Sequence, residues 1–177
     1  MLDQTDIKIL SILQQQGRRH LADIAKEVDL STPAVMERVK KLESRGIIKA
    51  FRAILDANKL GKNITAFIGV SVSHQPYIDN IGGLMAAAKD VLECHHVTGE
   101  ESFFLKVKTA DTGSLEKLIA EIRSLEGVTR TVTNVVLSTS KESQILSLER
   151  ALEKSSLNTQ TQHDQENRKF SGTLGKK

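Results

Sequence analysis

The sequence predicts an α+β protein whose helical first part is followed by a second part that forms a sheet. Apolar residues recur at helical spacing as far as Gly46, and from Thr65 onward the pattern changes to the alternation typical of strands. The charge changes with the period, since residues 1–63 carry a net charge of +4 and residues 64–154 carry −3. Two domains with different partners are therefore expected, and the basic first domain favours nucleic acid.

The stretch from Leu30 to Gly46 is the most strongly patterned helix of the chain. The residue before a proline avoids the helical region, so we expect Thr32 to be the N-cap and Pro33 the first helical residue. Apolar residues then recur at i, i+4 and i+7 and form one face: Val35, Val39 and Leu42. Gly46 can take the left-handed conformation that ends a helix. The other face is mostly basic: Glu37, Arg38, Lys40, Lys41 and Arg45.

Two shorter helices precede this one. Residues 2–16 have an apolar stripe that ends at Gly17, and residues 21–28 repeat the pattern. Residues 29–31 form a short turn into the basic helix. Two short helices, a tight turn and a basic third helix are typical of a helix-turn-helix, whose last helix enters the DNA major groove. Residues 47–56 alternate loosely, so we expect an extended wing or linking strand there.

The second part alternates strands and helices. Strands are expected at residues 65–73, 91–97, 102–109 and 128–138, and helices at 77–89 and 112–125. The order βαββαβ is the split, ferredoxin-like motif. Two helices on one face leave the other face of the sheet uncovered. We expect that face to carry residues such as Phe67, Val107 or Val135 and to pack against a second copy of the chain.

The chain therefore divides into three parts. We expect a winged helix-turn-helix domain with a linking strand at residues 1–63, and the βαββαβ domain at residues 64–142. Residues 143–177 form an extension. A partial apolar stripe predicts a helix over residues 142–154, and the polar composition from Ser155 onward predicts disorder.

No catalytic, cofactor or metal site stands out. The single cysteine excludes an internal disulfide framework, and no zinc spacing, phosphate-binding glycine loop or Ser/His/Asp arrangement is present. His95 and His96 are neighbours in an expected strand and point to opposite faces, so they cannot readily share a metal ion. No apolar run approaches the roughly 18 residues of a membrane-spanning helix, and the acidic N-terminus lacks a signal-peptide pattern. We expect a cytoplasmic, nucleoid-associated protein without a cofactor.

The predicted DNA contacts lie on the basic helix and just before the second helix. Hydroxyl side chains and unpaired N–H groups at a helix start suit phosphate oxygens, and Lys41 or Arg45 can reach bases or phosphates. For Arg38 a phosphate contact and an ion pair within the same domain are both open. The full set is Arg18, Ser31, Thr32, Pro33, Ala34, Met36, Glu37, Arg38, Lys41 and Arg45. Lys49 and Arg52, on the expected wing, are further candidates for backbone contacts.

Spaced residues along both parts form one longer pattern. It runs Leu2-Asp3-x-x-Asp6-x-x-Ile9-Leu10, then Arg18 ahead of Leu21-x-x-Ile24-Ala25, then Leu30-Ser31-x-x-x-Val35-x-x-Arg38-Val39-x-x-Leu42-Glu43-x-x-Gly46-Ile47-Ile48. The second part adds Val97-Thr98-Gly99, the βαββαβ order and Gly127-Val128. Over about residues 2–140 this pattern resembles the leucine-responsive/asparagine (Lrp/AsnC, feast/famine) family of regulators.

The resemblance implies a bacterial or archaeal transcription factor. Its partners would be double-stranded DNA, an amino acid or similar small effector, and further copies of itself, paired through the rear sheets and commonly assembled into octamers. The effector, bound between dimers, would meet the turn after the second expected strand and nearby residues: His96, Thr98, Gly99, Glu100, Glu101 and Ser102. Ser102 stands where the family usually has an acidic residue, and the C-terminal extension is longer than usual.

The missing acid bears on which effector is bound. The ammonium of an amino acid needs an acceptor, because an unpaired buried charge is costly. Either Glu100 or Glu101 replaces the acid, or the pocket takes a different ligand. A neutral Ser102 beside two glutamates and His96 favours a polar or basic amino acid over leucine. The alternative is that no small molecule binds and the turn only packs between dimers.

We therefore interpret the chain as a sequence-specific DNA-binding transcriptional regulator that responds to an amino acid. One alternative is an enzyme, because the same architecture resembles that of sirohaem decarboxylases and His95 and His96 could serve such chemistry. A basic, well-patterned helix at residues 32–45 argues against it, since an enzyme needs no groove-reading face. The other alternative is an architectural protein that binds DNA with little sequence preference.

Overall fold

The computed structural model describes residues 2–73 and 75–149, and these residues form two compact units. The front unit contains the described residues up to Ala53 together with those from Ser143, and the rear unit spans Ile54–Glu142. Each unit has its own hydrophobic core.

Three helices form the front unit: α1 (Gln4–Gln15), α2 (Leu21–Glu27) and α3 (Thr32–Ser44). Their apolar stripes meet in one core: Ile9, Leu13, Ile24, Ala25, Val35, Val39 and Leu42. A capping box starts α1, because Asp3 accepts the N–H of Asp6 at 2.7 Å and Asp6 accepts the N–H of Asp3 at 3.2 Å. The predicted helix-turn-helix is confirmed.

The start of α3 differs from the prediction by one residue. Ser31, not Thr32, is the N-cap: its backbone is extended and its hydroxyl accepts the N–H of Ala34 at 3.3 Å. Thr32 and Pro33 are the first two helical residues. A proline costs no hydrogen bond there, because the first N–H groups of a helix have no partner within it. The end of α3 agrees with the prediction, since Gly46 is left-handed with φ +68°.

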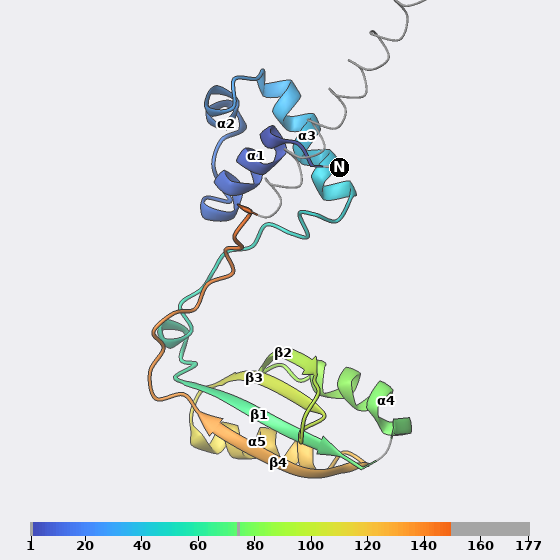
Figure 1. The fold of residues 1–177 in the computed structure, drawn as a ribbon. Helices are drawn as coiled ribbons and strands as arrows, with labels where there is room; N and C mark the ends of the chain where they lie inside the picture. The colour runs from blue at the N-terminus through green and yellow to red at the C-terminus, as the bar shows by residue number, and fades with distance from the viewer. Residues whose placement is uncertain (1, 74, 150–177) are drawn as a thin grey trace, which may run out of the picture. The chain divides into compact units, whose positions relative to one another are not determined.

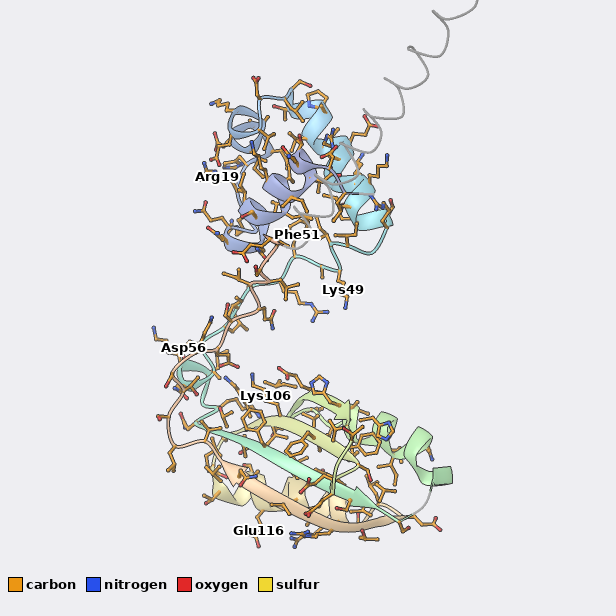
Figure 2. All side chains as sticks on the ribbon, viewed as in Figure 1. Arg19, Lys49, Phe51, Asp56, Lys106 and Glu116 are labelled. Carbon is orange, nitrogen blue, oxygen red and sulfur yellow. The ribbon has the colours of Figure 1, made fainter. Side chains whose placement is uncertain are left out.

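The segment after α3 does not form the predicted wing or linking strand. Residues 49–56 have no strand partner in the described structure, and Figure 2 labels Lys49, Phe51 and Asp56 along this connection. A strand needs partners for its backbone N–H and C=O groups, and the loose alternation of apolar residues did not supply them. Phe51 remains 47% exposed and Ile54 90% exposed.

The predicted domain boundary after residue 63 also differs from the division into units. Asn58–Leu60 form a short 3-10 helix, η1, and the Lys62 ammonium lies 2.5 Å from the Asp90 carboxylate in the rear unit. These residues therefore belong with the rear unit, and the units divide after Ala53.

The rear unit has the predicted βαββαβ order. Its elements are β1 (Ile64–Val72), α4 (Gln75–Ala86), β2 (Val91–His96), β3 (Phe103–Thr109), α5 (Thr112–Arg123) and β4 (Val128–Val135). The sheet order is β2-β3-β1-β4 with every neighbour antiparallel. Both helices pack on one face, where Ile81 and Met85 of α4 and Leu118 of α5 join the strand core. Figure 1 shows α5 lying along the sheet.

The other face of the sheet carries no helix, but only one of the three residues named for it lies there. Val107 is fully buried in the helix-covered core, and Val135 pairs with buried Ala66 and so points to the helix side. Side chains alternate along a strand, so Phe67, between buried Ala66 and Ile68, lies on the open face. The assignment of the two valines was wrong because it needed the strand register, which tertiary pairing sets.

The helix predicted over residues 142–154 does not begin at Glu142. Residues 141–148 have no regular structure, and of the described residues in this range only Glu149 is helical. The Glu142 carboxylate instead bonds Lys106 and Lys108, and the Leu146 backbone exchanges two 3.0 Å hydrogen bonds with the Gln14 amide. At Glu142 and Leu146, contacts with folded elements thus take the place of the predicted helix, whose apolar stripe was only partial. The rest of this predicted helix and the polar tail, residues 150–177, lie outside the described residues.

Candidate functional site

The outer surface of α3 brings together most of the residues predicted to contact DNA. Val35, Val39 and Leu42 fix one side of the helix in the core, and the opposite side is left to solvent. Exposed on α3 and its ends are Ser31, Thr32, Pro33, Met36, Glu37, Lys40, Lys41, Glu43, Ser44 and Arg45, whereas Ala34 is half-buried. This surface has an exposed helix start with two hydroxyl side chains, an apolar side chain and charges of both signs.

Arg38 is the exception on α3, because its guanidinium is held within the front unit. Its Nη1 lies 2.6 Å from Asp3 Oδ2 and 2.7 Å from Asp6 Oδ1. The hydrogen bonds to Asp3 and Asp6 raise the pKa of Arg38 above its ordinary value, although partial burial acts in the opposite direction. Of the two possibilities left open by the sequence, the contacts favour the structural ion pair.

Arg18 and Arg19 also differ in use, although they are neighbours in the turn between α1 and α2. Arg19, labelled in Figure 2, pairs with Glu27 and donates to Gln16 Oε1 at 3.0 Å, so it holds the turn to α2. Arg18 is exposed and makes no ion pair with any described residue. It is thus the arginine of this turn that is available to a phosphate.

The turn after β2 contains the residues predicted to meet an effector. The Val97 N–H donates to the Ser102 carbonyl at 3.0 Å, and the Ser102 N–H donates to the Val70 carbonyl at 2.8 Å. Gly99 sits at the tip with φ +130°, a conformation that other residues rarely adopt. Thr98, Gly99 and Glu100 are exposed. The turn is therefore anchored at its base and open at its tip.

The Ser102 side chain is used by the fold. Its Oγ accepts the Val72 N–H at 3.2 Å, which attaches the turn to the end of β1. A second hydroxyl, that of Ser71, donates to the Glu100 carbonyl at 3.3 Å. These bonds hold the backbone of the turn. The carboxylates of Glu100 and Glu101 take part in neither bond.

Glu101 lies across β1 at a position that only glycine allows. A Cβ atom on Gly69 would come within 2.7 Å of Glu101 Cγ and 3.3 Å of its carboxyl carbon. Gly69 is buried beneath this side chain, and Glu101 itself is half-buried. The sequence pattern did not single out Gly69, since nothing along the chain connects it with a residue 32 positions later.

The two histidines next to this turn point to opposite faces, as predicted for strand neighbours. His96 pairs with Phe103 at the core side, with ring centroids 5.1 Å apart, and His95 pairs with Phe104 and lies 3.3 Å from Glu93. Within the described residues no group of three or more His, Cys, Asp and Glu side chains is placed to hold a metal ion, and no helix is long and apolar enough to cross a membrane.

The open face of the sheet carries a charged cluster that the sequence analysis did not identify. Lys106, on β3, bonds both Glu142 and Glu93, and Lys108 lies 3.2 Å from Glu142. Bonds to the two lysines hold the pKa of Glu142 below its ordinary value, and the bond to Glu142 raises that of Lys106. Figure 2 shows Lys106 and the α5 residue Glu116 on opposite sides of the sheet. The spacing of Lys106 and Lys108, two residues apart in a strand, indicates that both lie on one face of the sheet. The sequence does not indicate that Glu142 is their partner.

Comparison with known proteins identifies both parts of the chain. Residues 2–49 match the family described as winged helix-turn-helix DNA-binding, and residues 65–146 match the Lrp/AsnC ligand binding domain. The HTH-type transcriptional regulator FL11 of Pyrococcus horikoshii is 36% identical over 141 residues, which cover 80% of this chain and 93% of that protein. The leucine-responsive regulatory protein of Haemophilus influenzae is 34% identical over 150 residues, covering 83% and 90%.

Solved structures agree with this assignment. A transcriptional regulator of Neisseria meningitidis, crystallised as an L-Met complex, superposes with a TM-score of 0.81 at 29% identity and covers 86% of this chain and 100% of its own. AsnC of E. coli superposes with a TM-score of 0.76 at 27% identity, covering 82% and 98%.

Proposed function

This chain belongs to the Lrp/AsnC family of transcriptional regulators, and we propose that it binds operator DNA through α3 and responds to an amino acid at the turn of residues 97–102. The similar proteins named above are transcriptional regulators and not enzymes, so the enzyme alternative loses its support. On this proposal the protein works at the nucleoid.

The outer surface of α3 carries the DNA part of the proposal. Its exposed lysines, Lys40 and Lys41, suit phosphates. The hydroxyls of Ser31 and Thr32 at its exposed start can donate to a phosphate oxygen. Ser31, Thr32, Pro33, Ala34, Met36, Glu37, Lys41 and Arg45 are proposed to line the contact, with Arg18 on the flanking backbone. Arg38 would act indirectly, by holding α3 against α1.

A binding map distinguishes this function from an architectural role. Chromatin immunoprecipitation of the full chain, with and without a panel of amino acids, should yield discrete sites whose occupancy changes with one or a few of them. Even coverage of the genome, unaffected by any amino acid, would instead support low-specificity binding.

The turn is proposed to hold the effector by its two charged groups. Backbone N–H groups near Gly99 can meet a carboxylate, because the glycine lets a ligand approach closely. The ammonium then needs an acceptor. Ser102 is already bonded to Val72, and Glu100 is exposed, whereas Glu101 is half-buried over Gly69. We therefore assign the ammonium to Glu101, with Thr98, Glu100 and His96 at the margins of the site.

Calorimetry with the twenty amino acids tests this assignment. Glu101→Gln should weaken binding more than Glu100→Gln, and Ser102→Asp should change which amino acid binds best. A polar or basic amino acid is expected to be preferred over leucine. Tight leucine binding that neither glutamine substitution affects would contradict the proposal, and no binding of any amino acid would favour a turn that only packs between dimers.

The open face of the sheet is proposed as the surface that pairs two copies. Phe67 and Phe104 are 40% and 36% exposed on this face and would be buried by a second sheet. Pairing would place two copies of α3 on two half-sites, as dimeric helix-turn-helix proteins require. Assembly of such dimers into octamers follows the family and is part of the proposal.

Sedimentation of the full chain tests the pairing. Phe67→Lys should shift the protein toward monomer, because a buried lysine would face a second copy of itself. Leu84→Lys is the matched control, since Leu84 is 50% exposed but lies on α4, away from the open face. A Phe67→Lys protein that associates as wild type does would rule out this face.

A further inference from the structure

Glu37 is the acidic residue at the centre of the outer surface of α3. It lies two residues after Val35 and two before Val39, and both valines are buried. An α-helix turns by about 100° per residue, so Glu37 points roughly 200° away from Val35, almost directly opposite the core. The Glu37 carboxylate therefore lies at the centre of any interface that this surface forms.

No described residue neutralises this carboxylate. Lys40 and Lys41 stand three and four residues later, the spacing at which a glutamate and a lysine can pair on a helix. Neither forms an ion pair with Glu37, and the neighbouring Arg38 is engaged by Asp3 and Asp6. Glu37 thus presents a free negative charge on the surface proposed to face a polyanion.

Such a charge restricts what the surface can bind. Near a phosphate a carboxylate is repelled, so Glu37 opposes binding wherever it finds no hydrogen-bond donor. In the major groove, guanine presents only acceptors, and thymine an acceptor and a methyl group. Cytosine presents the N4 amino donor, the usual partner of Glu or Asp, and adenine presents its N6 amino group beside an acceptor, N7. A carboxylate is therefore suited best to cytosine.

We propose that Glu37 is a specificity-determining residue, which accepts a hydrogen bond from a cytosine N4 amino group in each half-site and opposes binding to other sequences. The inference rests on the proposed docking of α3 in the major groove. It adds a base preference to that proposal, at one position per half-site.

Selection from a randomised DNA duplex library tests the inference, using the full-length wild type, Glu37→Gln and Glu43→Gln. The Glu43 control is the same residue type on the same helix and is also exposed, but it lies in the last turn, beside the buried Leu42. Each substitution replaces an exposed carboxylate by an amide of the same size, and circular dichroism will show that the variants are folded.

The wild type should select cytosine at one position of each half-site, and replacing that cytosine should weaken binding roughly 5- to 140-fold. Glu37→Gln should lose this preference or change it to adenine, which glutamine contacts through N6 and N7, while Glu43→Gln keeps the cytosine. A wild-type site that Glu37→Gln selects unchanged overturns the inference and leaves the proposed function standing. Failure of the wild type to enrich any duplex overturns both.

Discussion

The Arg38 guanidinium and the Asp6 carboxylate, 2.7 Å apart, join α3 to the first turn of α1. Asp6 is only 8% exposed and also caps its own helix by accepting the Asp3 N–H. The residue that the sequence left open as a DNA contact is therefore part of the framework that orients the DNA-facing helix.

Loss of this pair should destabilise the front unit. Arg38→Ala removes the Arg38 hydrogen bond from the mostly buried Asp6 carboxylate and leaves it the bond from the Asp3 N–H. Hydrogen bonds to charged groups contribute about 1.5–3 kcal/mol to the free energy of unfolding. We expect a loss of about that size in urea denaturation followed by helical circular dichroism. Arg18→Ala, at an exposed position of the same unit, should change the free energy of unfolding by less than about 0.5 kcal/mol. Equal effects of the two substitutions would contradict this role of Arg38.

Acid should remove part of the stability of the same unit through Asp3. Burial alone would raise the pKa of this carboxyl, but the Asp6 N–H and Arg38 lower it below the ordinary value of 3.8. A lowered pKa means that the folded state binds the proton less tightly than the unfolded state. The contribution is therefore complete above pH 3.8 and is lost as the pH falls through the lowered pKa.

Asp3→Asn isolates this effect, because asparagine keeps an N-cap oxygen but cannot titrate. The wild type should be the more stable protein at pH 6, and the difference should shrink as the pH falls toward 2.5. Urea denaturation across this range measures it. A difference that stays constant with pH would show that the Asp3 charge contributes nothing.

Removal of the Lys41 charge should reduce DNA binding in a way that identifies its contact. If Lys41 meets a phosphate, Lys41→Ala should weaken binding to all sequences and flatten the plot of log K against log salt by about one unit. If it reads a base, the loss should be about 1–3 kcal/mol and confined to the operator. Fluorescence anisotropy at several salt concentrations separates the two, with Lys117→Ala on α5 as control. Unchanged binding to every duplex would remove Lys41 from the interface.

A methyl group on Gly69 should displace Glu101 and weaken effector binding. The added Cβ would lie 2.7 Å from Glu101 Cγ, so the side chain must move. Gly69→Ala and Glu101→Gln should each reduce the affinity for the amino acid in calorimetry, and the double variant should lose less than the sum of the two.

Gly83→Ala is the matched control, since nothing lies within 4 Å of a Cβ at that helical position. It should bind the amino acid as wild type does. Strictly additive losses for Gly69→Ala and Glu101→Gln would mean that the two residues act separately.

Local patterns were enough to predict the helices of the front unit and the strands and helices of the rear unit, but they wrongly predicted a strand after α3. Helical spacing, the change of period and the turn glycines predicted the three helices and the βαββαβ order, because these signals act between residues close in sequence. The same holds for the left-handed end of α3 at Gly46. The N-cap of α3 was predicted one residue too late, because Ser31 and Thr32 are both residue types that cap helices. In the structure the Ser31 hydroxyl accepts the N–H of Ala34.

The partners of individual side chains were decided by the tertiary structure alone. Arg38 meets Asp3 and Asp6, Glu101 covers Gly69, and Glu142 bonds Lys106 across distances of 32 to 36 residues in sequence. The faces on which Val107 and Val135 lie were also decided by the tertiary structure, because strand register is set by pairing between distant segments. The sequence by itself determined that α3 would be an exposed, basic-sided helix, but only the packing of the front unit decided that Arg38 is occupied within it and Glu37 is left free. A residue's chemistry is set by its type, whereas its availability is set by which groups the fold brings within hydrogen-bonding distance.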